Sequence, residues 1–358
     1  MLLDRSNSRS VARSQPVHTC AFNTPCMRMN KKGRDKRSST VRCPKVSADL
    51  KLAGLPDGLA GDLAFRIFCT PELSQHRSHD HHVLTERARF HLRHARWERV
   101  QTPVGQLQTY VFEPDGDSRG TVLLVHGWTS EAAFMTAFIE PLRRTGLRVV
   151  AFDFPAHGFS SGRRTNLAEC ARALYCVCQH YGPIHAVVAH SFGGFVSLLV
   201  AEGGPPMPRA TPIERFVLLA CPDRLSDVTR NFGRGLGLSE GAQRMYERHL
   251  KRVGHRPVAT FSSSALLRKV GVPTLIMHGR DDREVPFHNA EEMARTCPSA
   301  RLMAFDGLNH RTLLYAPPVF RAVMMELAPE RALRDRMPAA AVAAPAAERG
   351  AQRADARA

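Results

Sequence analysis

One serine in this sequence stands where a hydroxyl becomes reactive. Ser191 lies in residues 189–194 (Ala-His-Ser-Phe-Gly-Gly), after an apolar run at 186–189 that predicts a strand and before a run that predicts a helix. A sharp strand-to-helix turn tolerates only small residues two positions from its centre, and Ala189 and Gly193 meet that need. The pattern predicts a nucleophile elbow, which lifts the serine hydroxyl out of the sheet near the positive end of the helix.

Two later segments could supply the partners that a nucleophilic serine needs. A base must remove its proton and a carboxylate must orient that base, here in the chain order serine, acid, histidine. Residues 274–279 predict a buried strand that leads into Asp281 and Asp282, and residues 301–305 predict a strand that ends shortly before His310. Because the carboxyl ends of parallel strands meet at one edge of a sheet, these side chains can converge on Ser191.

The elements around these residues predict an α/β fold. From residue 121 onward, Val/Ile/Leu-rich strands and amphipathic helices alternate, which is typical of a mostly parallel central sheet with helices on both faces. Strands are predicted over 97–101 and 106–113 (a hairpin), 121–125, 147–152, 186–189, 216–219, 274–277 and 301–305, and helices over 61–69, 83–94, 131–145, 166–181, 192–201, 289–296 and 319–327.

An insert interrupts this alternation between the sixth and seventh strands. Residues 223–271 are rich in Arg and Gly, and they predict a small helical lid over the strand ends where open parallel sheets bind ligands. The organisation expected is therefore one domain over 51–329, which includes the lid. A disordered basic arm over 1–50 precedes it, and a disordered Ala/Arg-rich tail over 330–358 follows it.

The net charge of +17 belongs largely to the two ends of the chain. Residues 1–45 hold eleven Lys and Arg against two acidic residues, and residues 330–358 contribute a further +2, so the middle carries only +6. We therefore do not expect nucleic-acid binding to be the function.

No apolar stretch approaches the roughly 18 residues that a membrane span needs. Nine cysteines without paired CxxC units, and no secretory signal, predict reduced thiols and a cytoplasmic location.

Taken together, the motifs resemble those of the α/β-hydrolase superfamily of serine esterases and lipases, over about residues 96–327. Besides the elbow, residues 126–128 (His-Gly-Trp) are similar to the family's oxyanion-hole turn. Residues 153–161 are similar to its Asp-x-Pro-Gly-His-Gly-x-Ser segment, with Ala156 where glycine is usual. Residues 278–286 are similar to its acid loop, and residues 307–310 to its histidine loop. The resemblance implies an α/β-hydrolase fold.

The resemblance also implies a role for each residue. Ser191 is expected to be the nucleophile, His310 the general base and acid, and Asp282 the orienting carboxylate. The backbone N–H groups of Trp128 and Phe192 are expected to form the oxyanion hole, with the Trp128 side chain lining the acyl pocket. No metal or organic cofactor is implied.

Other residues compete for these roles. Asp281 adjoins Asp282, and Asp223 follows the predicted strand 216–219 in the acid position that some superfamily members use. His126 and His157 are expected to make structural hydrogen bonds, and His190 to pack locally. Cys178 and Cys221 are expected to be buried thiols rather than nucleophiles. Four histidines, His76, His79, His81 and His82, cluster in a segment that we interpret as a polar loop. The spacing of these histidines is not that of a zinc-binding helix, so we do not expect a metal site there.

The function that these residues favour is hydrolysis of a carboxylic ester of a small molecule through an acyl-Ser191 intermediate. Haloalkane dehalogenases and epoxide hydrolases of this fold need an aspartate nucleophile, which Ser191 excludes, and Phe192 stands where the perhydrolase relatives often have Met. A thioesterase or acyltransferase and a carbon–carbon bond hydrolase would use the same three residues. The arginines of the lid could attract a phosphate-bearing acyl carrier. A ligand receptor or nucleic-acid binder without catalysis is a further alternative, and the oligomeric state stays open.

Overall fold

The computed structural model describes residues 51–74 and 79–328. The predicted arm over 1–50 and tail over 330–358 lie outside these residues, as does His76. None of the helices in the described ranges is long and apolar enough to cross a membrane.

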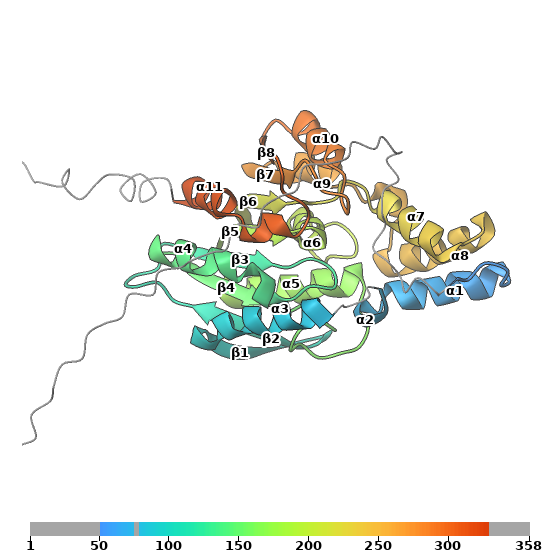
Figure 1. Ribbon diagram of the computed structural model, residues 1–358, viewed down its shortest axis with the longest axis horizontal. Coiled ribbons are helices and arrows are strands. Elements are labelled where there is room, and N and C mark those ends of the chain that lie inside the picture. Colours follow the sequence, from blue (N-terminus) through green and yellow to red (C-terminus); the bar gives the residue numbers. More distant parts are fainter. Residues whose placement is uncertain (1–50, 75–78, 329–358) are drawn as a thin grey trace, which may run out of the picture. The chain divides into compact units, whose positions relative to one another are not determined.

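The described elements alternate as the sequence predicts (Figure 1). The strands are β1 (Arg96–Thr102), β2 (Gly105–Phe112), β3 (Thr121–Val125), β4 (Arg148–Phe152), β5 (Ile184–His190), β6 (Ile213–Leu219), β7 (Thr274–Gly279) and β8 (Ala300–Phe305). The α-helices are α1 (Asp57–Phe68), α2 (Pro71–Ser74), α3 (His79–Phe90), α4 (Ile139–Arg144), α5 (Leu167–Tyr181), α6 (Phe192–Glu202), α7 (Leu225–Leu236), α8 (Glu240–Gly254), α9 (Ser263–Val270), α10 (His288–Thr296) and α11 (Pro317–Leu327). Four 3₁₀ helices complete them: η1 (His91–His94), η2 (Ala132–Phe138), η3 (Val258–Thr260) and η4 (Thr312–Tyr315).

All eight strands form one sheet in the order β1-β2-β4-β3-β5-β6-β7-β8. Strand β2 runs antiparallel to both of its neighbours, and every other pairing is parallel. The carboxyl ends of β3 to β8 therefore meet at one edge of the sheet. This confirms the mostly parallel sheet of the α/β-hydrolase fold that the sequence predicts.

Apolar side chains cover both faces of the sheet, because the strands alternate their side chains between the two faces. Along β3, Leu123 and Val125 enter the core beneath α5, α6 and α9, whereas Val122 and Leu124 enter the core beneath α4 and α11. All five residues of β3 are buried. A strand enclosed on both sides must be apolar throughout, which explains the continuous run at 121–125.

Two elements differ from the sequence-based expectation. The helix predicted over 131–145 consists of the 3₁₀ helix η2 followed by the short helix α4. Pro141 fits only the first turn of an α-helix, so an α-helix in this segment must begin close to it, and α4 begins at Ile139. The second difference concerns the predicted polar loop. His79, His81 and His82 lie in helix α3, which starts four residues earlier than the predicted helix.

A cap of helices lies between β6 and β7, where the lid is predicted. It consists of α7 and α8, whereas α9 packs against α6 and α10 and so belongs to the layer that covers the sheet. Helix α1, from the start of the described chain, lies alongside α8 (Figure 1). The cap is therefore built from two segments far apart in the sequence, and the sequence pattern did not indicate the contribution of α1.

Gly61 sets the close approach of α1 to α8. A Cβ atom at this position would lie 2.5 Å from Cβ of Met245 and 2.9 Å from the carbonyl oxygen of Ala242. We expect Gly61→Ala to lower the free energy of unfolding by about 1–3 kcal/mol, the usual cost of overpacking. Gly58→Ala on the same helix is the control, because no heavy atom lies within 4 Å of its added Cβ. Urea unfolding of the two variants measures this, and equal stabilities would contradict the prediction.

Candidate active site

Ser191 occupies a strained turn between β5 and α6. Its φ is 52° and its ψ is −121°, values that an L-residue adopts only when its surroundings hold it there. The Ser191 N–H donates to the carbonyl oxygen of Leu219 at the end of β6 (2.8 Å). A Cβ atom at Gly193 would lie 2.4 Å from the carbonyl oxygen of His126, so the elbow packs directly on the end of β3. The turn therefore requires glycine at position 193.

Asp282 and His310 meet at the same edge of the sheet. His310 Nδ1 donates to Oδ2 of Asp282 (2.8 Å), and the N–H groups of Glu284 and Val285 donate to Oδ1 (2.8 Å each). The Asp282 side chain is inaccessible to solvent. Three donors on a buried carboxylate fix its position, and its hydrogen bond with Nδ1 leaves Nε2 of the neutral His310 ring with a lone pair.

The pKa of Asp282 results from opposing influences. Burial raises it, but the His278 and His310 rings beside the carboxylate outweigh burial and hold the pKa well below its ordinary range. His278 Nε2 lies 3.4 Å from Oδ2 of Asp282 and donates to the carbonyl oxygen of Val285 (2.8 Å). The carboxylate thus stays ionised in a buried site. A charge there is suited to stabilise a protonated His310 ring.

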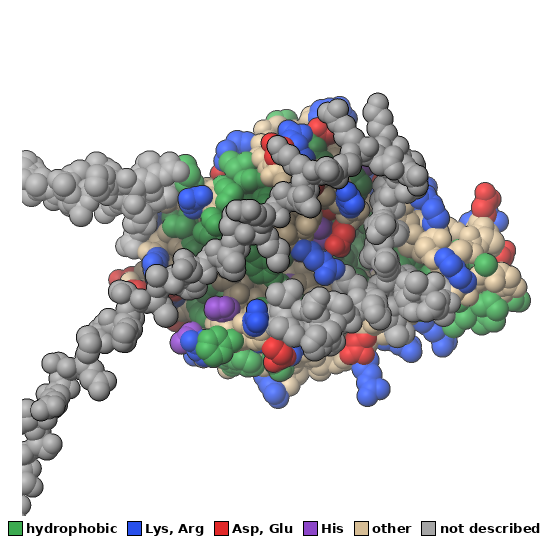
Figure 2. Space-filling model, in the orientation of Figure 1, with side chains coloured by type: hydrophobic (Ala, Val, Ile, Leu, Met, Phe, Trp, Pro, Cys, Tyr) green, Lys and Arg blue, Asp and Glu red, His purple; other side chains and the backbone are tan. Residues whose placement is uncertain are grey.

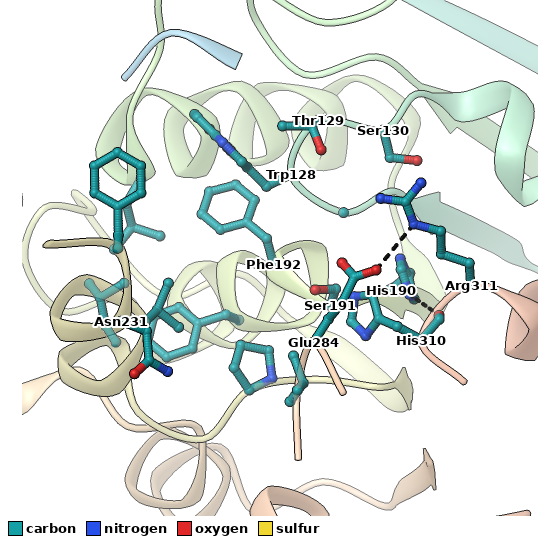
Figure 3. Close-up of a pocket in the computed structure, with 18 of the residues that line it drawn as sticks. Trp128, Thr129, Ser130, His190, Ser191, Phe192, Asn231, Glu284, His310 and Arg311 are labelled. Atoms are coloured by element: carbon teal, nitrogen blue, oxygen red, sulfur yellow. Dashed lines mark hydrogen bonds and ion pairs between the residues drawn. The ribbon is translucent and has the colours of Figure 1, made fainter. Parts of the chain in front are cut away.

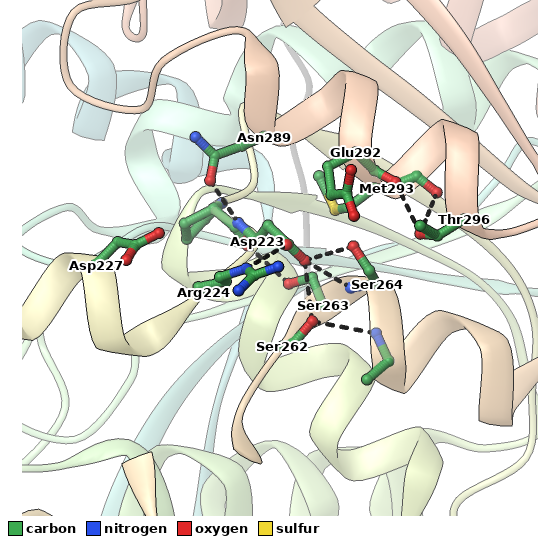
Figure 4. A network of polar contacts seen from close by, with 12 residues as sticks. Asp223, Arg224, Asp227, Ser262, Ser263, Ser264, Asn289, Glu292, Met293 and Thr296 are labelled. Carbon is green, nitrogen blue, oxygen red and sulfur yellow. Dashed lines mark hydrogen bonds and ion pairs between the residues drawn. The ribbon is translucent and has the colours of Figure 1, made fainter. Parts of the chain in front are cut away.

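The two competing aspartates lie in other networks. The N–H and hydroxyl of Ser264 donate to Oδ1 of Asp223 (2.8 and 2.6 Å), so this carboxylate secures the start of α9 (Figure 4). The Gly307 N–H donates to Oδ2 of Asp281 (2.8 Å), which ties the acid loop to the histidine loop. Of the three aspartates, Asp282 is the one that has a hydrogen bond to the His310 ring.

The turn after β3 lies against the elbow. A Cβ atom at Gly127 would be 3.2 Å from Cβ of Ser191, so glycine permits this close approach. Trp128 follows, and Thr129 has a φ of 57°. Phe192 is the first residue of α6, and N–H groups in the first turn of a helix have no acceptor within it. The turn at Gly127 thus lies against Ser191, next to the start of α6. The oxyanion hole expected from the N–H groups of Trp128 and Phe192 stays a prediction.

Two buried histidines hold this turn in place. His126 accepts a hydrogen bond from the Phe154 N–H at Nε2 (3.0 Å) and donates from Nδ1 to the carbonyl oxygen of Gly127 (2.7 Å). His157 accepts from the Thr129 N–H at Nε2 (3.2 Å) and donates from Nδ1 to the carbonyl oxygen of Pro155 (2.9 Å). Each ring needs one nitrogen without a proton, so both must be neutral. Burial lowers the pKa of His126 to about 4, which keeps it neutral.

Asp153 completes the support of the turn. Its carboxylate accepts hydrogen bonds from the Ala132 and Phe159 N–H groups and from the Tyr110 hydroxyl (2.8, 2.9 and 2.8 Å). Ala156 has a φ of 62°, which explains why glycine is usual at that position of the resembling motif. The segment after β4 therefore supports the turn that follows β3.

His190 has a role that the sequence did not reveal. Its ring lies 4.6 Å from the ring of His310, and its Nε2 donates to the carbonyl oxygen of His310 (3.0 Å). Burial lowers the pKa of His190 well below its ordinary value. The residue before the nucleophile thus anchors the backbone of His310. Only the contact between two segments 120 residues apart could show this.

A cavity of about 290 Å³ opens above these residues (Figure 3). Ser191, His190 and His310 lie in its wall, and most of the remaining wall is apolar. Trp128 and Phe192 lie on one side of Ser191, whereas Arg311 lies on the other and pairs with Glu284 (3.2 Å). The site therefore offers an apolar side and a charged side to a molecule bound at the serine. Within 51–74 and 79–328, no cluster of His, Cys, Asp and Glu could hold a metal ion.

Comparison with known proteins identifies the family. Residues 122–323 match the model of the alpha/beta hydrolase family, and this match spans more than half of the chain. The chain belongs to this family.

Among its relatives, a non-heme haloperoxidase of Rhodococcus erythropolis is 29% identical over 249 residues, which cover 56% of this chain and 89% of that protein. A pimeloyl-[acyl-carrier protein] methyl ester esterase of Nitrosomonas europaea is 24% identical over 234 residues, with coverages of 56% and 92%. The fold is similar to that of Est1E from Butyrivibrio proteoclasticus, solved with ferulic acid bound, at a TM-score of 0.53. That match has 18% identity and covers 67% of this chain and all of the other.

The neutral state of His126 makes stability depend on pH. In the unfolded chain its imidazole takes up a proton near pH 6.5, whereas the buried ring stays neutral down to about pH 4. Between about pH 6.5 and pH 4 the unfolded state therefore binds more protons than the folded state. As the pH drops through this range, the His126 ring alone lowers the free energy of unfolding by about 3 kcal/mol. Urea unfolding at pH 7 and about pH 4.5 should show a smaller loss for His126→Asn than for the original protein. An equal loss would contradict this.

Proposed function

We propose that this protein is a serine hydrolase that cleaves carboxylic esters through an acyl-Ser191 intermediate. The observation that carries the proposal is the buried hydrogen bond from His310 Nδ1 to Asp282 Oδ2 (2.8 Å), beside a cavity whose wall includes Ser191 at a strained elbow. Ser191 and His310 line the same cavity, and the carboxylate of Asp282 holds Nδ1 of His310, so Nε2 is the ring nitrogen left to act on the serine hydroxyl. Such an arrangement is how a serine hydroxyl becomes a nucleophile.

The chemical steps follow from these positions. Oγ of Ser191 attacks the ester carbonyl carbon while Nε2 of His310 accepts its proton, and Asp282 stabilises the imidazolium that forms. The oxyanion accepts hydrogen bonds from the backbone N–H groups of Phe192 and Trp128. His310 then protonates the departing alcohol. Water, activated by the same imidazole, releases the acid and frees Ser191.

The two sides of the cavity favour opposite ends of an ester. The apolar side, which holds Trp128 and Phe192, suits a hydrocarbon acyl chain. The charged side, with Arg311 and Glu284, suits a polar alcohol that leaves into solvent, because both side chains are partly exposed (50% and 36%). We therefore propose an ester of an apolar carboxylic acid with a small polar alcohol as the substrate class.

A thioester substrate remains the main alternative. The arginines on the outside of the cap are exposed, and Figure 2 shows Lys and Arg side chains around this end of the molecule. They are Arg224, Arg230, Arg234, Arg244, Arg248 and Arg252. Rates with acyl-CoA and with simple esters, with and without added salt, separate the two substrates, since a charged carrier would lose its advantage in salt. The carbon–carbon bond alternative and the cytoplasmic location stay predictions.

The nucleophile can be tested directly. We expect a fluorophosphonate probe to label the protein, and Ser191→Ala to abolish both labelling and hydrolysis of p-nitrophenyl esters, with a loss of at least about 10⁴-fold in kcat. Cys178→Ala, which removes a buried thiol, is the control and should label normally. If Ser191→Ala kept full ester hydrolysis, the proposal would be wrong.

The catalytic acid can be tested by comparing two aspartates. Asp282→Asn should lower kcat by about 10⁴-fold, because an amide can favour the wrong tautomer of His310. Asp223→Asn should keep kcat within an order of magnitude. It should instead destabilise the protein by about 1–3 kcal/mol, since Asp223 accepts hydrogen bonds at the start of α9. Steady-state kinetics together with thermal unfolding distinguish these outcomes, and the reverse pattern would assign the acid to Asp223.

A further inference from the structure

Helix α1 lies outside the part of the chain that matches the family, yet it contributes to the cavity. The family match begins at residue 122, and α1 spans Asp57–Phe68. Its last residue, Phe68, is among the residues that line the cavity. A segment that precedes the hydrolase core thus supplies part of the wall of its candidate active site.

Several contacts along its length hold α1 in this position. Asp57 accepts a hydrogen bond from Ser239 Oγ at the start of α8 (2.5 Å), and Asp62 pairs with His249 (2.5 Å). At the other end, the Thr165 N–H donates to the carbonyl oxygen of Cys69 (2.9 Å), just after α1. Phe68 is therefore held between the cap and the loop that leads into α5.

A row of aromatic rings connects the elbow with the cap. The ring of Phe192, next to the nucleophile, lies 5.1 Å from Trp128, and Trp128 is stacked on Phe68 (6.2 Å, 18°). Phe68 in turn contacts the rings of Phe232 and Tyr246, at 5.0 and 5.6 Å. Successive rings at these distances form a continuous apolar wall that leads away from Ser191.

Phe68 and Phe232 form part of the cavity wall at the cap. Both rings line the cavity, whereas Tyr246, which lies 5.6 Å from Phe68 and 6.0 Å from Phe232, is fully buried and does not line it. The Phe68 ring therefore stands between the cavity and Tyr246 in the interior of the cap. An extended hydrocarbon chain that starts at Ser191 and follows the row of rings would meet this ring.

We infer that Phe68 is a specificity-determining residue that limits the length of the acyl chain the site accepts. The inference rests on the proposed function, because it assigns the apolar side of the cavity to the acyl group. Each methylene buried in an apolar site improves binding by about fourfold, equivalent to about 0.8 kcal/mol. This gain should continue along the acyl series until the chain reaches Phe68, and it should then stop.

The test uses two substitutions that change the cavity in opposite directions. We expect Phe68→Ala to move the optimum of kcat/KM to longer p-nitrophenyl esters. The kcat/KM of the first ester that the original protein rejects, divided by that of the last ester it accepts, should rise about 16-fold, as expected for about two added methylenes at about fourfold each. Phe68→Trp should move the optimum to shorter chains. A uniform change at all chain lengths, or no shift in either variant, would overturn the inference.

Phe65→Ala is the matched control. Phe65 lies on the same helix and stacks on His249 of α8 (5.2 Å), but it does not line the cavity. This variant should lose a comparable contact between α1 and α8 and keep the original chain-length profile. If Phe65→Ala shifted the profile as Phe68→Ala does, cap looseness rather than the Phe68 ring would set the limit, and the inference would fail.

A binding experiment separates this inference from the proposed function. Straight-chain carboxylic acids are titrated by calorimetry into Ser191→Ala and into the same protein with Phe68→Ala or Phe68→Trp added. The longest acid that gains affinity should increase with Ala and decrease with Trp, whether or not the protein hydrolyses esters. Unshifted chain-length limits would contradict the role of Phe68, whereas absent hydrolysis with shifted limits would contradict only the proposed function.

Discussion

The strained turn at Ser191 is the constraint on which the arrangement of the site depends. A residue at φ 52° and ψ −121° costs about 1–3 kcal/mol, so neighbouring structure must hold it. That support comes from the end of β6 through Leu219 and from the end of β3 through the close contact of Gly193. The same packing brings Gly127 against the serine. One turn therefore fixes how Ser191 meets the turn that follows β3.

Neutral histidines stabilise the loops around this turn. His126 and His157 each accept a backbone N–H and donate to a backbone carbonyl, and His190 donates to the carbonyl of His310. An imidazole can do both only without a charge, and burial lowers the pKa of His126 and His190 accordingly. Asp282 has the opposite requirement, because it must stay ionised beside His310. The site thus combines the buried charge of Asp282 with several buried neutral rings.

The cap completes a wall that the core begins. The sheet edge presents Ser191 and His310, and the apolar wall combines core residues such as Trp128 and Phe192 with residues of the cap helices, including Phe68 of α1. Close packing at Gly61 and the pairing of Asp62 with His249 join α1 to α8. Cavity shape therefore depends on a helix that precedes the first strand, while the chemistry depends on residues after the third.

The sequence by itself determined the elements that have local signals. Small residues around Ser191 and apolar runs at 121–125 and 274–279 predicted the fold class and the nucleophile, and the resemblance of the later segments to the family's acid and histidine loops added Asp282 and His310 before any contact was known. Only the tertiary structure decided which aspartate meets His310, that His190 anchors its backbone, and that Phe68 lines the cavity. The first outcome depends on a contact between residues 28 positions apart and the second on a contact between residues 120 positions apart. The third depends on the packing of α1 near a core that follows it in the sequence. Periodicity and spacing report how a segment folds, but they carry no information about which distant segment packs against it.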